Sequence, residues 1–183
     1  MNPIRQWFKV GLASIVLLLG RMKSLPTVGG SSEVGKPTAC ASPGYRQFDF
    51  WVGDWDAFDV DSPSTAVARI RVDRILDGCV LHEDYQDTSG LQGQSFSIYD
   101  ASRKVWHQSW VTNRGQLLVI EGKMQAGEMV LSGVDHDADG KQRQIRGTWR
   151  PVDGGARESA VTSIDRGKTW KPWFDLLFRP HKP

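Results

Sequence analysis

The stretch Ala66–Asp73, with the sequence AVARIRVD, decides the fold class. Apolar side chains occupy the even positions from 66 to 72, while Arg69, Arg71 and Asp73 occupy odd positions. Because successive side chains of a strand point to opposite faces of a sheet, this alternation predicts a half-buried β-strand with its charges facing outward.

The same period recurs along the chain, in short stretches separated by turn signals such as Asp139-Gly140 and Arg166-Gly167. Sequential strands joined by tight turns form a meander, which is best stabilised by closing on itself. The sequence therefore predicts an all-β fold, a single antiparallel up-and-down β-barrel of about ten strands. A two-sheet sandwich is the alternative. The residues that share the apolar faces are Cys79, Leu81, Glu83 and Tyr85, then Trp106, Gln108 and Trp110, then Ile145, Gly147 and Trp149, and finally Trp170, Pro172, Phe174, Leu176 and Phe178.

Residues 1–30 have the pattern of a signal peptide, because Arg5 and Lys9 precede the apolar run Val10–Gly20. That run is shorter than the roughly 20 residues that a membrane helix needs, so we expect no transmembrane segment in the mature chain. The expected location is exported, either periplasmic or secreted. An uncleaved membrane anchor is the alternative.

The rest of the chain divides into a linker and one domain. Residues 31–44 are rich in Gly, Ser, Pro and Thr, which predicts a flexible linker. Residues 45–183 suffice for one domain with a single core and are too few for two ordinary ones. At the start of this domain, Phe48, Trp51 and Trp55 recur at helical spacing, which indicates one helical turn over 45–51.

The charge balance argues against a nucleic-acid partner. The chain has 23 basic and 21 acidic residues, and the first 32 residues contain four of the basic ones and no acidic one. The mature chain therefore has 19 basic and 21 acidic residues, a net charge of −2, without a basic cluster.

Cys40 and Cys79 are the two cysteines of the chain. In an oxidising exported compartment, two cysteines more often pair than stay free, which predicts a Cys40–Cys79 disulfide. A lipid on Cys40 is the alternative, although Pro37 stands where a lipoprotein signal favours Leu.

The segment FDFWVGDWD, Phe48–Asp56, resembles the signature of a family of exported bacterial lipocalin-like proteins of unknown function. The likeness covers about residues 40–179 and implies a barrel and a Cys40 retained in the mature chain, with no activity. Gly53-Asp54-Trp55 also matches the Gly-x-Trp of the first lipocalin strand, which implies that the Trp55 indole packs across the closed end. The other segments that resemble the exported lipocalin-like family are Ile75–Cys79, Trp106–Val111, Met129–Gly133, Thr148-Trp149 and Asp165–Trp170.

Two motifs suggest chemistry that their context does not support. The segment Ser163–Trp170 fits the Asp-box pattern of sialidase-type propellers, but it occurs once, so we interpret it as a hairpin capped by Asp165. The segment Asp135–Gly140 matches the first half of a calcium loop, but Arg146 stands where the closing Glu should be. A solvated turn is the preferred interpretation.

The four histidines, His82, His107, His136 and His181, lack metal-ligand spacing, so the sequence predicts no metal site and no cofactor. His181, close to the carboxyl end, is placed like the haem ligand of nitrobindin-type barrels, but the glycine-rich signature of that group is missing. Haem binding is therefore a minor alternative.

The candidate site consists of polar residues on apolar faces. Glu83 shares its face with Leu81 and Tyr85, and Gln108 lies between Trp106 and Trp110. Buried polar groups need partners, so Glu83 and Gln108 either belong to a structural core network or orient a ligand. The first hypothesis is a binding module that holds a small, largely apolar molecule. Its predicted ligand-binding residues are Trp55, Glu83, Trp106, Gln108, Trp110 and Trp149.

Two other hypotheses depend on what the interior of the barrel contains. A barrel filled by its own side chains would be a structural or interaction protein with an exposed apolar patch. An enzyme, for instance a hydrolase, needs two titratable groups in one cleft, and Glu83 is the one inward carboxylate that the pattern predicts. We therefore assign no catalytic residue, and the oligomeric state is left open.

Overall fold

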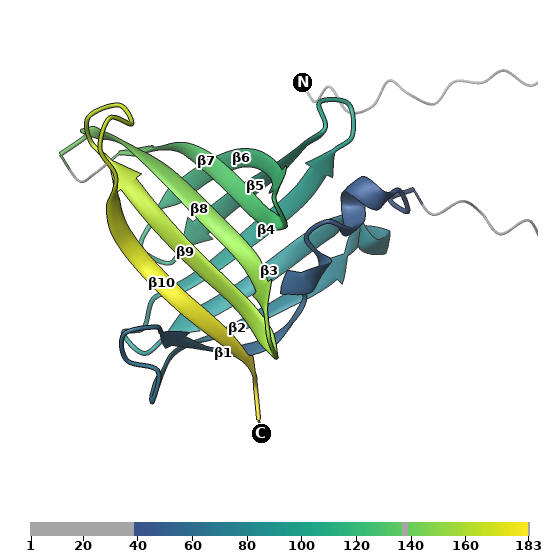
Figure 1. Cartoon of the computed structure of the whole chain (residues 1–183), viewed down its shortest axis with the longest axis horizontal. Coiled ribbons are helices and arrows are strands. Elements are labelled where there is room, and N and C mark those ends of the chain that lie inside the picture. The colour runs from purple at the N-terminus through teal and green to yellow at the C-terminus, as the bar shows by residue number, and fades with distance from the viewer. Residues whose placement is uncertain (1–38, 137–138, 183) are drawn as a thin grey trace, which may run out of the picture. The chain divides into compact units, whose positions relative to one another are not determined.

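A computed structural model describes residues 39–136 and 139–182 (Figure 1). This described part contains three 3-10 turns: η2 (Pro43–Arg46) and η3 (Asp49–Trp51) precede the first strand, and η4 (Leu76–Gly78) lies between the second and third. The strands are β1 (Gly53–Asp59), β2 (Ala66–Ile75), β3 (Val80–Asp87), β4 (Gln92–Asp100), β5 (Val105–Thr112), β6 (Leu117–Gln125), β7 (Glu128–His136), β8 (Gln142–Val152), β9 (Gly155–Ser163) and β10 (Lys171–Pro180).

The strands form one closed barrel in which each strand pairs with its neighbours in the chain. All pairs are antiparallel, and β10 closes the barrel against β1, with Ala57 opposite Phe178. The predicted all-β, up-and-down barrel of about ten strands is therefore confirmed, and the sandwich is excluded. Closure leaves no strand edge exposed among these ten, which removes a site of aggregation.

The N-terminal plug, which we define as residues 40–52, packs at one end of the barrel (Figure 1). It contains η2 and η3, so the predicted helical turn is confirmed as two short 3-10 turns. Phe48 and Trp51 are almost completely buried and belong to the main core cluster. Residues 40–44, assigned above to the linker, already belong to the plug: Cys40 is buried and η2 begins at Pro43.

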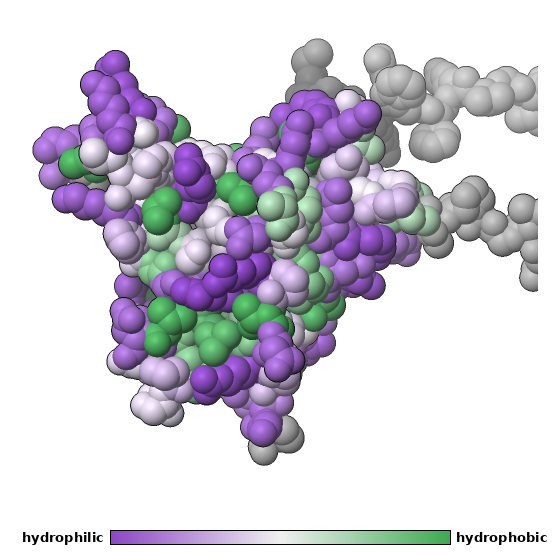
Figure 2. Space-filling view, in the orientation of Figure 1, coloured by the Kyte–Doolittle hydropathy of each residue, from purple (hydrophilic) through white to green (hydrophobic). Residues whose placement is uncertain are grey.

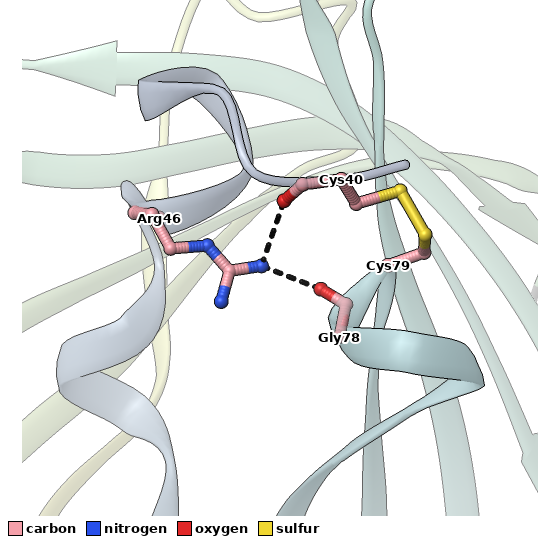
Figure 3. Close-up of a disulfide and its surroundings, with 4 residues drawn as sticks. All are labelled: Cys40, Arg46, Gly78 and Cys79. Carbon is pink, nitrogen blue, oxygen red and sulfur yellow. Dashed lines mark hydrogen bonds between the residues drawn. A yellow bond between two sulfur atoms is a disulfide. The ribbon is translucent and has the colours of Figure 1, made fainter. Parts of the chain in front are cut away.

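The predicted disulfide between Cys40 and Cys79 is confirmed, and it ties the plug to the start of β3 (Figure 3). The Arg46 guanidinium lies beside it and donates hydrogen bonds to the carbonyl oxygens of Cys40, at 3.3 Å, and Gly78. Asp49 of the plug forms an ion pair with Arg74 of β2. One covalent link and two arginines therefore anchor the same segment.

The last strand departs from the predicted pattern. Phe174, Leu176 and Phe178 face inward as expected, but the register with β9 shifts between Pro172 and Phe174. The expectation that Trp170 and Pro172 share this inner face is therefore wrong. Trp170 instead packs in the β9–β10 hairpin, where its indole N–H donates to the Gly167 carbonyl oxygen at 3.1 Å.

The Asp-box segment is a capped hairpin turn, as the sequence indicated. The Asp165 carboxylate accepts hydrogen bonds from the Thr169 backbone N–H at 2.9 Å and from the Ser163 hydroxyl at 2.7 Å. Gly167 has a φ of 84°, a left-handed conformation that glycine adopts without strain. The Thr169 hydroxyl also donates to Asp165, at 2.6 Å, and is the main cause that lowers the pKa of Asp165 to about 2, followed by the Thr169 backbone N–H and the Ser163 hydroxyl.

The predicted signal peptide lies outside the described residues, as does most of the predicted linker. Within the described part, no helix is long and apolar enough to cross a membrane.

Gly122 of β6 allows close backbone packing against β7. A Cβ atom added at Gly122 would lie 1.9 Å from the Val130 carbonyl oxygen, a backbone atom that cannot rotate away. We expect Gly122→Ala to lower the free energy of unfolding by roughly 1–3 kcal/mol, as overpacking usually does. Urea unfolding followed by tryptophan fluorescence measures this loss. Ser132→Ala, at an exposed position of β7, is the control, and equal midpoints for the two variants would contradict the prediction.

Candidate ligand-binding cavity

A cavity of about 310 Å³ lies inside the barrel, toward the end opposite the plug. Residues from the β3–β4 and β5–β6 turns and from the start of β10 line its outer part, which we call the mouth: Leu91, Gln116 and Trp173. The other lining residues are Glu83, Tyr85, Gln108, Trp110, Leu118, Ile120, Ile145, Gly147, Trp149, Glu158, Ala160, Phe174 and Leu176.

The inner boundary of the cavity is an aromatic floor made by the plug and the barrel wall. Phe48 stacks on Trp51 with ring centroids 4.9 Å apart and meets Trp106 edge-on at 5.6 Å. Trp149 contacts both plug aromatics, at 5.5 Å from Phe48 and 5.9 Å from Trp51, and also lines the cavity. The floor is therefore closed by packed rings, and Trp149 separates it from the open space.

A chain of hydrogen bonds holds Glu83 and Gln108 in the wall of β3, β4 and β5. The Gln108 side-chain amide donates to the Ser97 hydroxyl at 3.0 Å and, more weakly, to the Ser95 hydroxyl at 3.4 Å. The Ser95 hydroxyl in turn donates to Glu83 Oε2 at 2.7 Å. Both serines are fully buried, so they fix the orientation of two side chains that reach the cavity.

Glu158 of β9 is a second carboxylate in the same cavity. In the strand order of the barrel, β9 lies nearly opposite β3, so Glu83 and Glu158 approach the space from different walls. Glu158 makes no hydrogen bond or ion pair with another described residue. The Glu158 side chain is partly accessible and lines the cavity.

The enclosed setting makes both carboxyl groups hard to ionise. Burial is the main cause that raises the pKa of Glu83 to about 7, with the Ser95 hydrogen bond opposing the rise. Burial, followed by the charge of Glu83, raises the pKa of Glu158 well above its usual value. The Trp149 indole N–H lowers the pKa of Glu158 in part, although this contact falls short of a hydrogen bond.

Tyr85 stands beside these carboxyls and stays neutral. Burial, with the charges of Asp87, Glu158 and Glu83, raises the pKa of the Tyr85 phenol to about 12. Its ring meets Trp110 edge-on at 5.5 Å. The cavity therefore combines two carboxyls, a phenol and an amide with broad aromatic surfaces.

An ion pair borders the mouth. Arg143 of β8 donates to Asp135 of β7 at 2.7 Å, and its guanidinium lies 4.9 Å from the centre of the Trp173 ring. Gln116 reaches the same Asp135 carboxylate at 3.5 Å. Asp135, the first residue of the candidate calcium loop, is thus bound to an arginine, and residues 137–138 of that loop lie outside the described part.

Four of the six predicted ligand-binding residues line the cavity, namely Glu83, Gln108, Trp110 and Trp149. The other two, Trp55 and Trp106, lie in the packed core near the plug. The Trp55 indole N–H donates to the Trp51 carbonyl oxygen at 3.0 Å, and that of Trp106 donates to Gln47 at 3.2 Å. Both indole N–H groups therefore form hydrogen bonds within the protein, and neither indole lines the cavity.

The expectation that Glu83 is the one inward carboxylate is wrong, because Glu158 also lines the cavity. A signal for it was present in the sequence. Glu158 shares its parity with Ala156 and Ala160, two small residues that are almost completely buried. The strand has low hydrophobicity, however, which concealed its inner face. The mouth residue Trp173 was missed for a different reason, since the register shift in β10 changes its direction.

The histidines lie away from the cavity. His107 contacts Glu121 at 2.9 Å, His82 stacks on Phe96, and His181 contacts Asp56 at 2.9 Å next to β1. His181 is therefore not placed as a ligand for a group inside the barrel. Among the described residues, no cluster of three or more His, Cys, Asp or Glu side chains could hold a metal ion.

The outer wall carries apolar residues as well as charged ones, and the face drawn in Figure 2 shows the two kinds intermixed. Phe96 and Ile98 of β4 point outward, because Ser95 and Ser97 occupy the inner positions of that strand. Val119 and Val134 are exposed on β6 and β7. The structural hypothesis predicted an exposed apolar patch without an internal cavity, and it stays untested.

No protein-family profile matches this chain, and no curated protein matches it with significant similarity.

Proposed function

We propose that this barrel binds one small, mainly apolar molecule in its cavity. The observation that carries the proposal is a cavity of about 310 Å³ that opens at its mouth, with Glu83 and Gln108 held by hydrogen bonds at its wall. An engineered apolar cavity of about 150 Å³ already binds benzene, so this space suits a ligand of roughly two rings. A few fixed polar groups in an aromatic cavity are typical of ligand sites.

The alternative, a barrel without a ligand, receives less support. A barrel filled by its own side chains has no internal cavity, and unfilled space costs dispersion energy. The exposed residues on β4, β6 and β7 are compatible with an additional contact surface, but they do not account for two enclosed carboxyls.

We also infer that the protein is exported and works in the periplasm or outside the cell. The intramolecular disulfide supports this location, since disulfides persist mainly in oxidising compartments. We also propose that the chain belongs to the exported lipocalin-like family that its sequence resembles. Intact-mass analysis of protein purified from the periplasmic or secreted fraction of its own host tests export: a mass starting near residue 31 supports it, and a full-length mass found only in the cytoplasmic fraction contradicts it.

Ala160→Phe is expected to block ligand binding. Ala160 lines the cavity and is almost completely buried, so a phenyl ring there would occupy the space of a ligand. We expect the affinity for the neutral fluorescent probe N-phenyl-1-naphthylamine to fall about tenfold or more, equivalent to about 1.4 kcal/mol. A fluorescence titration at pH 7 measures it.

Ala101→Phe is the matched control, because Ala101 lies exposed in the β4–β5 turn. It should bind the probe like the unmodified protein. Circular dichroism of both variants verifies that the barrel is intact. Equal probe binding by folded Ala160→Phe, or a lack of saturable binding by the unmodified protein, would contradict binding in this cavity.

A further inference from the structure

The charge inside the cavity is one-sided. Two carboxylic acids, Glu83 and Glu158, line it, and no Lys, Arg or His from the described part of the chain does so. The nearby guanidinium of Arg143 is already paired with Asp135 at the mouth. The other charges that act on the polar groups of the cavity are also negative, namely Asp84 on Glu83 and Asp87 on Tyr85.

Several polar atoms of the cavity lack the partners that buried groups normally have. Glu83 receives one hydrogen bond, to Oε2, and Glu158 receives none from the described residues. The buried indole N–H of Trp149 lies near Glu158 but does not complete a hydrogen bond with it. Two carboxyls on facing walls of one cavity, with no cationic side chain among its lining residues, suit a ligand that brings a positively charged donor.

We infer that the ligand is an organic amine, bound as its ammonium ion between Glu83 and Glu158 with its apolar part against the indoles of Trp110 and Trp149. This inference rests on the proposed function and specifies the chemical class of the ligand. An ammonium ion supplies the hydrogen-bond donors that both carboxylates can accept, and charge-assisted hydrogen bonds are stronger than neutral ones.

The rings around the cavity fit the same ligand. Trp110, Trp149, Tyr85 and Trp173 present aromatic surface to the space, and ring faces attract cations. Two carboxylates without a third ligating side chain are a poor metal site, which favours an organic cation over a metal ion. Once the two carboxyls are ionised, an anionic ligand would meet two like charges, and a neutral ligand would leave both carboxylates without a positive partner.

Three probes with one apolar frame test the inference: 1-naphthylmethylamine, 1-naphthalenemethanol and 1-naphthoic acid. They carry an ammonium, a hydroxyl and a carboxylate on the same ring system. By isothermal titration calorimetry at pH 8, we expect the amine to bind roughly 10–100 times more tightly than the alcohol, the range of a hydrogen bond to a charged group. The acid should bind more weakly than the alcohol.

Two conservative variants locate the effect. Glu83→Gln and Glu158→Gln should each weaken amine binding about tenfold or more and leave alcohol binding within about twofold. Asp84→Asn is the matched control, because it removes one negative charge from the exposed side of β3, next to Glu83 in sequence. It should retain the amine preference. The two substitutions lie on different strands, β3 and β9, so each tests the amine preference independently of the other.

The outcomes separate this inference from the proposed function. If the alcohol binds and the amine has no advantage, or if both Gln variants keep the full amine preference, the cavity binds ligands but the amine inference is wrong. If none of the three probes binds, both proposals fail. An amine preference that both Gln variants abolish supports both.

Discussion

Replacing Cys40 and Cys79 together by alanine is expected to lower the free energy of unfolding by about 4 kcal/mol. The disulfide joins residues 39 positions apart in the sequence, and closing a loop of that length removes a corresponding amount of entropy from the unfolded chain. For a domain of roughly 150 residues, this loss lowers the melting temperature by about 10 °C.

The effect reaches the cavity because the disulfide holds the plug. The plug supplies Phe48 and Trp51 to the floor, and its other anchors are the hydrogen bonds of Arg46 and the ion pair of Asp49 with Arg74. Without the covalent link, we expect the plug to detach at a lower temperature than the barrel unfolds. Near-ultraviolet circular dichroism, which reports the packed indoles, should then change before the far-ultraviolet signal.

Reduction provides the control for this prediction. Dithiothreitol should lower the melting temperature of the unmodified protein to that of the Cys40→Ala, Cys79→Ala variant and should leave the variant unchanged. If the variant melts together with the oxidised unmodified protein, the cross-link does not contribute to stability in the way that loop closure requires.

Glu83→Gln is expected to stabilise the protein at pH 8 by an amount on the order of 3 kcal/mol. The pKa of Glu83 rises from an ordinary value of 4.5 to about 7 in the folded state, chiefly through burial. A shift of one pKa unit corresponds to about 1.4 kcal/mol, which gives the magnitude. Gln keeps the shape and can still accept the hydrogen bond from Ser95.

The sign of the pH dependence follows from proton binding. Between pH 4.5 and about 7, the folded protein keeps a proton on Glu83 that the unfolded chain has lost, so the free energy of unfolding falls as the pH rises. The contribution of the neutral carboxyl is complete below pH 4.5 and is lost above about 7. Glu83→Gln should therefore match the unmodified protein near pH 4 and exceed it at pH 8.

Urea unfolding at several pH values measures this difference, and comparison of the two proteins removes the contribution of every other titrating group. Asp84→Asn serves as control, because its carboxylate is exposed and interacts with Glu83 only as a minor cause of the pKa shift. A stability gain of Glu83→Gln that is the same at pH 4 and pH 8 would show that the carboxyl is not held neutral by burial.

Part of the site was predictable from local patterns. The parity of Glu83, Gln108, Trp110 and Trp149 on their strands assigned them to the inner face, and each lines the cavity. An even or odd position in a strand indicates only whether the side chain faces the inside or the outside of the barrel. It does not indicate how far along the barrel axis the side chain lies. Trp55 and Trp106 have the correct parity but lie at the level of the plug, where neighbouring side chains fill the space.

What the sequence determined by itself was the barrel. A period of two and short turns require antiparallel neighbours, and one apolar face requires closure, so β1 to β10 follow from local chemistry. The disulfide followed from two cysteines in a chain with an export pattern.

Only the tertiary structure decided which side chains meet. Glu83 and Glu158 are 75 positions apart and share no local pattern, yet barrel closure places β3 and β9 on facing walls of one cavity. Whether that space is filled depends on the summed volumes of side chains from all strands and the plug, and on the register shift that turns Trp173 toward the mouth. These are properties of the closed barrel, because no single strand encloses a volume.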